Sequence, residues 1–288
     1  MEKYSDWRDK GTGIAPFLPP VTKKYSTFSI IIKSLILLVK ITILLPLILL
    51  NIILQNAKIN NLILKFLFGY NLTVTIKGVK RREINAKQHY PQLNRLYICN
   101  STSPLDTMIL DSLSQGPSAF IVPVHNIFYK MNSAEYRKFA LSGSLDAKQF
   151  GHKIQHFIQL KGHVCYLFAE GTLSNGKSIL PFEVNITTLL EFFELNVKND
   201  SLPVLQTIHI KVGNSLTTPL PVSQYTYFWR LLENSASIKC IISEPQENSS
   251  LDKLRITLND DDKYKLVSKS LDIDAKKRFI YEYKTHKD

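Results

Sequence analysis

Residues 96–106 read Leu-Tyr-Ile-Cys-Asn-Ser-Thr-Ser-Pro-Leu-Asp, and this stretch contains the strand, turn and helix start on which the fold depends. The apolar run Leu96–Cys99 predicts a short buried strand. The polar turn after it leads into a helix expected over residues 107–113. Ser103 and Pro104 are common at helix starts, so the turn by itself indicates an ordinary cap rather than a ligand site.

A second polar loop follows a second apolar strand. Residues 164–168 predict the strand, and residues 168–177 read Phe-Ala-Glu-Gly-Thr-Leu-Ser-Asn-Gly-Lys. A carboxylate, two glycines, hydroxyl groups and a lysine can orient a phosphorylated substrate through backbone N–H groups and one positive charge. The glycine and lysine spacing is not that of a Walker phosphate loop. Because open α/β sheets bind ligands beyond the carboxyl ends of their strands, both loops are candidates for a site.

The chain beyond residue 70 alternates strand-like and helix-like segments. Further strands are predicted at residues 72–76, 120–122, 203–210 and 238–242, and further helices at residues 133–141, 148–160, 251–258 and 275–283. This order predicts an α/β fold with a mostly parallel sheet flanked by helices. We expect one such domain over residues 71–288.

An apolar tract precedes this domain. Of the twenty residues from Leu35 to Leu54, sixteen are apolar, which suits a helix that crosses a bilayer core. Pro46 removes a helical hydrogen bond near the middle and favours a kinked re-entrant or hairpin insertion over a single span. With the interfacial segment Leu62–Phe68, the tract predicts a membrane anchor over residues 30–70. A signal peptide is disfavoured because no small-residue cleavage site follows, and a buried soluble helix because the tract is apolar all round.

The net charge of +12 is concentrated near the N-terminus. Residues 1–100 contain 15 Lys and Arg against 4 Asp and Glu, whereas the other 188 residues contain 21 against 20. Basic residues beside an apolar tract suit an anionic lipid surface. The sequence has no zinc-finger spacing or aromatic RNA-binding signature that would indicate a nucleic-acid partner. Residues 1–29, with several Gly and Pro residues, are expected to form an extended basic arm.

The cysteines and histidines do not indicate a metal site. Three widely spaced cysteines disfavour a disulfide framework and indicate a reducing compartment. His152 and His156 would lie one turn apart on the predicted helix 148–160, but no nearby carboxylate completes a site, so an exposed pair is favoured.

The two loops together, in this order, resemble the glycerol-phosphate and lysophosphatidic acid acyltransferase family. The first motif of that family is a His, four residues and an Asp, and residues 101–106 occupy its place. The third motif reads Phe-Pro-Glu-Gly-Thr-Arg-Ser, and residues 168–174 occupy its place. Gly143 and Lys148 loosely match a family glycine followed five residues later by a basic residue. Residues 7–19 resemble the fungal branch of the family, and the resemblance covers nearly the whole chain.

The resemblance implies an acyl-CoA-dependent acylation of lysophosphatidic acid to phosphatidic acid, with oleoyl-CoA as the donor, in phospholipid and triacylglycerol synthesis. It also implies a place at the endoplasmic reticulum membrane and the lipid droplet, with a cytosolic catalytic domain, and roles in lipid-droplet homeostasis and vacuolar protein sorting. Acyl-CoA and a lysophospholipid are the expected partners. We expect no cofactor beyond acyl-CoA as co-substrate, no metal and no nucleic acid.

The resemblance also implies catalytic residues, with one departure. In the family a histidine, held by the aspartate, takes the proton from the acceptor hydroxyl. Here Ser101 occupies the histidine position, and serine cannot act as a general base. Asp106 remains. His125 is the preferred surrogate base, and Asp106 acting through a bound water is the other possibility.

The expected substrate-binding residues contain a second departure. The resemblance assigns the phosphoglycerol to Glu170–Thr172, but Leu173 stands where the family has an arginine that holds the substrate phosphate. Lys148 or Lys177 would then have to replace that arginine.

Two other functions remain open on the sequence alone. The substitutions at Ser101 and Leu173 fit a catalytically silent lipid-binding or scaffold protein in lipid-droplet or vacuolar trafficking. A soluble α/β enzyme of another kind, with the apolar tract as a buried helix, is the second.

Overall fold

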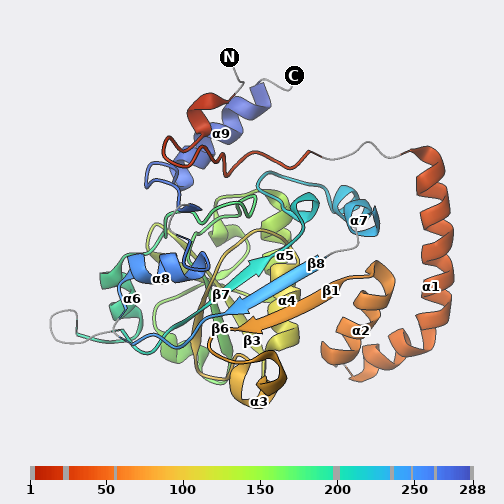
Figure 1. Cartoon of the computed structure of the whole chain (residues 1–288), viewed down its shortest axis with the longest axis horizontal. Coiled ribbons are helices and arrows are strands. Elements are labelled where there is room, and N and C mark those ends of the chain that lie inside the picture. Colours follow the sequence, from red (N-terminus) through yellow and green to blue (C-terminus); the bar gives the residue numbers. More distant parts are fainter. Residues whose placement is uncertain are drawn as a thin grey trace.

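The architecture is that of a computed structural model, which describes residues 4–21, 26–54, 57–196, 202–233, 237–247, 249–262 and 265–285. The strands it describes are β1 (Asn71–Ile76), β2 (Leu96–Cys99), β3 (Ser118–Val124), β4 (Ile127–Met131), β5 (His152–Ile154), β6 (Val164–Phe168), β7 (Gln206–Lys211) and β8 (Ser237–Ile242). The helices are α1 (Thr27–Leu54), α2 (Ala57–Phe68), α3 (Ala86–His89), α4 (Asp106–Leu113), α5 (Ser133–Ser142), α6 (Ile186–Phe192), α7 (Gln224–Glu233), α8 (Leu251–Leu258) and α9 (Ile273–Thr285). The fold is therefore α/β, with a single sheet among the described residues and an apolar N-terminal helix (Figure 1).

The sheet has the order β1-β8-β7-β2-β6-β3-β4-β5 and is mixed. Its centre is parallel, because β2 pairs with β6 and β7, and β3 pairs with β6. The β3–β4, β4–β5 and β7–β8 pairs are antiparallel, so the expected mostly parallel sheet is corrected to a mixed one. One reason is the turn between β3 and β4, where His125 and Asn126 take φ angles of 48° and 61°. Two such residues close a tight hairpin, and this turn has no glycine to indicate it in the sequence.

The helix expected over residues 148–160 is wrong. This stretch forms β5 between two short 3₁₀ turns, Ala147–Gln149 and Phe157–Leu160, and β5 pairs with β4. A Cβ at Gly151 would lie 2.6 Å from the carbonyl oxygen of Lys130, so the glycine allows the two backbones to approach. His152 and His156 therefore share no helix face. The imidazole of His156 lies 3.3 Å from Glu194 instead.

Helices cover both faces of the sheet. Because strand side chains alternate between faces, Tyr97 and Cys99 of β2 pack with α4 and α5, whereas Leu96 and Ile98 pack with α6 and α8. The predicted strand 164–168 and helix 251–258 are confirmed at those bounds. Helices α6 and α7 and strands β4 and β5 were not predicted.

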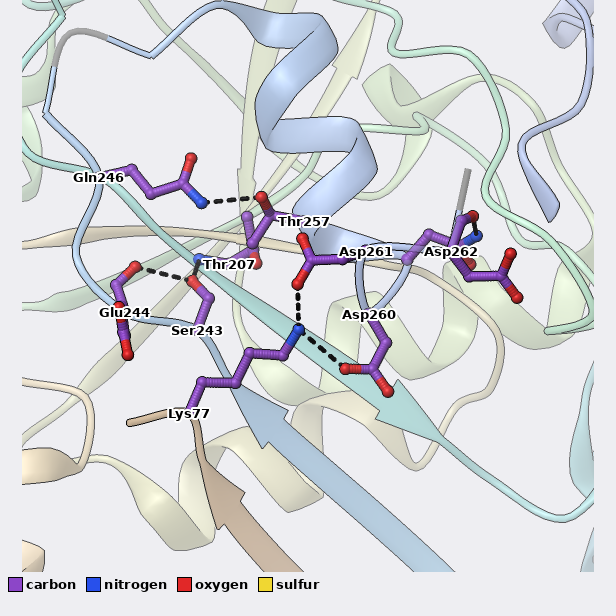
Figure 2. Close-up of polar contacts among 10 residues, drawn as sticks. Lys77, Thr207, Ser243, Glu244, Gln246, Thr257, Asp260, Asp261 and Asp262 are labelled. Carbon is purple, nitrogen blue, oxygen red and sulfur yellow. Dashed lines mark hydrogen bonds and ion pairs between the residues drawn. The ribbon is translucent and has the colours of Figure 1, made fainter. Parts of the chain in front are cut away.

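The turn that follows α8 forms ion pairs with the residue that follows the edge strand β1 (Figure 2). Lys77, which follows β1, places its ammonium 2.9 Å from the Asp260 carboxylate and 2.6 Å from that of Asp261. Within the last turn of α8, the Thr257 hydroxyl accepts a hydrogen bond from the Gln246 amide at 2.7 Å. The carboxylates are exposed, so these ion pairs contribute about 1 kcal/mol or less each.

The N-terminal arm packs against the α/β domain rather than extending away from it. In Figure 1 this segment runs beside α9. The Trp7 indole N–H donates to the Glu282 carboxylate at 2.7 Å, and the backbone N–H of Ser268 donates to Asp9 at 2.8 Å. Phe17 is fully buried, and its ring lies 5.9 Å from that of Phe279. The arm therefore links the apolar helix α1 to the C-terminal helix.

Helix α1 is long and apolar enough to cross a membrane, and Leu44 is the one residue of it that is buried in the protein. The helix continues through Pro46. A proline inside a helix commonly bends it without ending it. Helix α2 returns beside it, with the Lys40 ammonium donating to the Leu67 carbonyl at 3.1 Å.

Candidate active site

The two polar loops meet at the carboxyl ends of β2 and β6. These strands pair in parallel, with Cys99 opposite Phe168, so the residues that follow them lie side by side. The backbone N–H of Ser101 donates to Glu170 Oε1 at 3.1 Å, and that of Ser174 donates to the Ser101 carbonyl at 2.9 Å. The pairing of β2 with β6 thus creates the candidate site.

Asp106 is the first residue of α4 and turns back toward the loop before it. Its Oδ2 accepts hydrogen bonds from the backbone N–H groups of Thr102 at 2.7 Å and Ser103 at 2.9 Å. The carboxyl is fully buried. Burial raises the pKa of Asp106 to about 7, although the two N–H donors favour the charged form and lower it.

Two hydroxyl pairs surround this carboxyl. Ser101 Oγ lies 2.6 Å from the hydroxyl of Tyr136, a residue of α5. Ser103 Oγ lies 2.8 Å from the hydroxyl of Tyr227, a residue of α7. Ser101 therefore turns to Tyr136 rather than replacing a histidine held by Asp106. The sequence did not indicate either tyrosine, because each comes from a distant helix.

Glu170 holds the two loops together. Besides its bond to Ser101, its Oε2 accepts from the backbone N–H of Leu180 at 2.8 Å. Burial raises the pKa of Glu170 to about 8, and the backbone donors partly offset this. The next residue, Gly171, has a φ of 65°, and a Cβ there would lie 2.6 Å from the Pro123 carbonyl oxygen. Only glycine fits this position without strain.

Lys276 of α9 reaches the same loop and was missed in the sequence. Its ammonium donates to Thr172 Oγ1 at 2.8 Å and to the Leu173 carbonyl at 2.6 Å. The side chain is 1% exposed. Burial lowers its pKa to about 7, which the charge of Glu170 partly opposes. In sequence, Lys276 is one of three consecutive basic residues, a pattern typical of a solvated helix face.

The other predicted site residues lie outside this buried group. His125 is in the exposed β3–β4 turn and lines a cavity of about 550 Å³ together with Gly143. Lys148 and Lys177 are exposed. The side chain of Leu173 is 2% exposed and packs in the hydrophobic core, so it cannot contact a phosphate at the surface.

Helix α7 and the loop before it cover the buried group. The Thr218 N–H donates to the Thr102 carbonyl at 2.9 Å, next to the Ser103–Tyr227 pair. On the same helix, the Phe228 ring contacts Phe68 of α2 edge-on, with the ring centroids 5.9 Å apart. One helix thus contacts both the candidate site and the segment after the apolar helix. Among the described residues, no three His, Cys, Asp or Glu side chains converge as a metal site.

Comparison with known proteins identifies a relative along nearly the whole chain. Lysophosphatidic acid:oleoyl-CoA acyltransferase 1 of Saccharomyces cerevisiae is 44% identical over 291 aligned residues. The alignment covers 98% of this chain and 97% of the yeast protein. No protein-family profile matches the chain, and no solved structure matches it.

Proposed function

Because the chain belongs to the lysophosphatidic acid acyltransferase family, we propose that it transfers an acyl group from acyl-CoA to the free hydroxyl of lysophosphatidic acid. Oleoyl-CoA is the proposed donor, as in the name of the yeast relative. The product, phosphatidic acid, is a precursor for phospholipids and triacylglycerol. The contact between Ser101 and Glu170, which joins the two loops beside Asp106, is the observation that supports this proposal most directly.

The chemistry requires a base. An ester bond forms between the acceptor oxygen and the acyl carbon, the C–S bond of the thioester breaks, and the CoA thiolate leaves. The hydroxyl proton must pass to a group with a pKa near neutrality. That group then gives the proton to the CoA thiolate or to solvent. Asp106 suits this step, because two backbone N–H groups fix its position and burial raises its pKa to about 7. In this proposal the carboxylate itself takes over the proton transfer that a histidine performs in the family.

The remaining groups of the site have supporting roles in this proposal. The Ser101–Tyr136 hydroxyl pair can donate a hydrogen bond to the oxyanion that forms on the thioester carbonyl. Gly171 and Thr172 lie next to the glycerol part of the acceptor. Glu170 fixes the loops through its two backbone donors. No step requires a metal.

The membrane part of the proposal rests on α1 and on the family. An apolar helix beside the domain would hold it at the endoplasmic reticulum membrane or at a lipid droplet, where the acceptor is concentrated in two dimensions. The domain would then face the cytosol, where acyl-CoA is present. Helix α7 contacts α2, so a lipid substrate would approach the site from that side.

The Asp106→Asn variant tests the assignment. In vesicles with labelled oleoyl-CoA and lysophosphatidic acid, it should lose on the order of 10²- to 10⁴-fold in kcat, the usual contribution of a general base. The wild-type kcat/KM should rise with pH and level off above about pH 7, where Asp106 is ionised. Asp252→Asn, an exposed residue of α8, is the control and should retain activity.

Two outcomes would contradict the proposal. Full turnover by Asp106→Asn would show that the base lies elsewhere, and His125→Ala would then be compared. A wild-type protein that binds lysophosphatidic acid without turnover above background would instead support the catalytically silent lipid-binding function, for which Ser101 and Leu173 are the motivating residues.

A further inference from the structure

The acceptor carries a phosphate, and the one cation that we have placed among the described residues of the candidate site is Lys276. Leu173, which stands where the resemblance implies that the family has a phosphate-binding arginine, is buried in the core. Lys276 is enclosed and donates to protein oxygens. A phosphomonoester is bound best by a guanidinium group, whose planar fork matches two phosphate oxygens. Such a group has to come from another part of the chain.

A basic cavity lies next to the segments that cover the site. It has a volume of about 350 Å³ and is formed by the N-terminal arm, the loop before α7, α7 itself and α9. Its lining residues are Pro19, Pro20, Leu220, Pro221, Val222, Arg230, Ile280, Tyr283 and Lys284. Two of these side chains are cationic and none is anionic. Arg230 is 9% exposed, so its charge is partly shielded from water, whereas Lys284 is exposed at the rim.

Helix α7 contributes one residue to the cavity and another to the candidate site. Tyr227 lies one helical turn before Arg230, and its hydroxyl contacts Ser103 beside Asp106. Burial raises the pKa of Tyr227; the charge of Asp106 raises it further, and that of Arg230 lowers it. Tyr227 is thus close to both charged groups. The acceptor hydroxyl and the phosphorus of a lysophosphatidic acid are separated by only a few bonds, and the charges of Asp106 and Arg230 both act on the one Tyr227 hydroxyl.

The arm and the loop before α7 hold the other walls in place. The Asn175 side-chain amide, in the loop that contains Glu170, donates to the carbonyl oxygens of Ala15 at 2.8 Å and Leu18 at 3.2 Å. Pro221 packs against Gly143, where an added Cβ would lie 2.5 Å from the proline ring. One of the loops of the candidate site therefore holds the arm just before the cavity residues Pro19 and Pro20, and the residue after α5 packs on Pro221.

We propose that this cavity is the phosphate subsite, in which Arg230, assisted by Lys284, binds the phosphomonoester of the acyl acceptor. The proposal rests on the proposed function, since it names the place where that substrate is held. The phosphates of acyl-CoA have the same chemistry and are the competing source. The acceptor is favoured because its phosphate lies close to its reacting hydroxyl, whereas the CoA phosphates lie far from the thioester.

Steady-state kinetics of Arg230→Gln and Lys284→Gln, with each substrate varied in turn, test the proposal. Loss of a charge-assisted bidentate contact should raise the KM for lysophosphatidic acid by about 10- to 100-fold in Arg230→Gln and by less in Lys284→Gln. The KM for oleoyl-CoA should stay unchanged, and Arg230→Lys should recover part of the loss. Lys277→Gln removes the same charge from an exposed position of α9 and should leave both KM values unchanged.

Titration with glycerol 3-phosphate gives a second measurement that does not depend on turnover. Wild-type protein in micelles should bind this probe, and Arg230→Gln should not.

A rise in the KM for oleoyl-CoA alone would overturn the acceptor assignment and place the CoA phosphates in the cavity. Unchanged KM values and unchanged probe binding in both variants would overturn the subsite. Arg230-dependent probe binding by a protein without turnover would leave the subsite intact and contradict the proposed function instead. If Arg230→Gln fails to fold, Lys284→Gln at the exposed rim still decides the outcome.

Discussion

The acidity of Asp106 and Glu170 is set by their surroundings more than by their residue type. Both carboxyls are at most 1% exposed, and burial raises their pKa values to about 7 and about 8. The motif resemblance predicted these two residues, and the structure brings them together with Ser101. It could not predict that the Ser101 hydroxyl pairs with Tyr136, because that contact depends on how α5 packs on the sheet.

A pH dependence of stability follows at this residue scale. The folded-state pKa of Asp106 is raised above the ordinary value of 3.8, so this group stabilises the fold fully below about pH 4 and loses that contribution as the pH rises to about 7. The free energy of unfolding of wild type should therefore fall as the pH rises through this window, whereas that of Asp106→Asn lacks this dependence. The difference, variant minus wild type, should increase by up to about 1.4 kcal/mol per pH unit. Denaturant unfolding of detergent-solubilised protein at several pH values measures it. A difference that does not vary with pH would show that the carboxyl is already ionised in the folded state.

Helix α9 shows how packing can change the role of an element. Its sequence is charged and amphipathic, a pattern typical of a helix with one solvated face. In the structure it docks against the N-terminal arm through Phe279, which is fully buried, and directs Lys276 into the loop after Gly171. The contact with Thr172 joins residues 104 positions apart. Sequence periodicity identifies an apolar face but not the partner that covers it.

Lys276→Met should impair catalysis more than folding. It removes both hydrogen bonds from the ammonium to the Thr172–Leu173 segment, and a misplaced loop at the candidate site should cost on the order of 10- to 100-fold in kcat. The effect on stability should be small, because removal of a buried charge offsets the lost hydrogen bonds. Turnover and thermal unfolding, measured together, separate the two effects, and Lys277→Met on the exposed side is the control. A large loss of stability with normal kcat would mean that Lys276 is only structural.

At the scale of the whole molecule, an exposed apolar helix is attached to a folded α/β domain. Leu38 and Leu45 of α1 are 64% and 48% exposed, whereas every residue of the central strands β2 and β6 is buried. A lipid surface would cover these side chains. The arm on one side of α1 and α2 on the other both contact the domain, so the helix is held beside it.

The double variant Leu38→Asp/Leu45→Asp should release the protein from membranes. Each aspartate near the middle of an inserted helix costs about 3 kcal/mol. Cell fractionation with alkaline carbonate should move this variant from the pellet to the supernatant. Ile158→Asp/Val204→Asp, at exposed apolar positions of the α/β domain, should stay in the pellet with wild type. Wild-type protein in the carbonate supernatant would instead support a soluble enzyme.

The sequence by itself determined the parts of this protein that depend on neighbouring residues. Hydrophobic patterning located the apolar helix, the strands β2 and β6 and the helix α8, because local periodicity decides those elements. Motif spacing located Asp106 and the Glu170 loop. Only the tertiary structure decided the mixed sheet, the edge strand β5, and the contacts of Tyr136, Tyr227 and Lys276 with the site. These features join residues far apart in the chain, and their burial, which sets the pKa values of the site, exists only once the chain has folded.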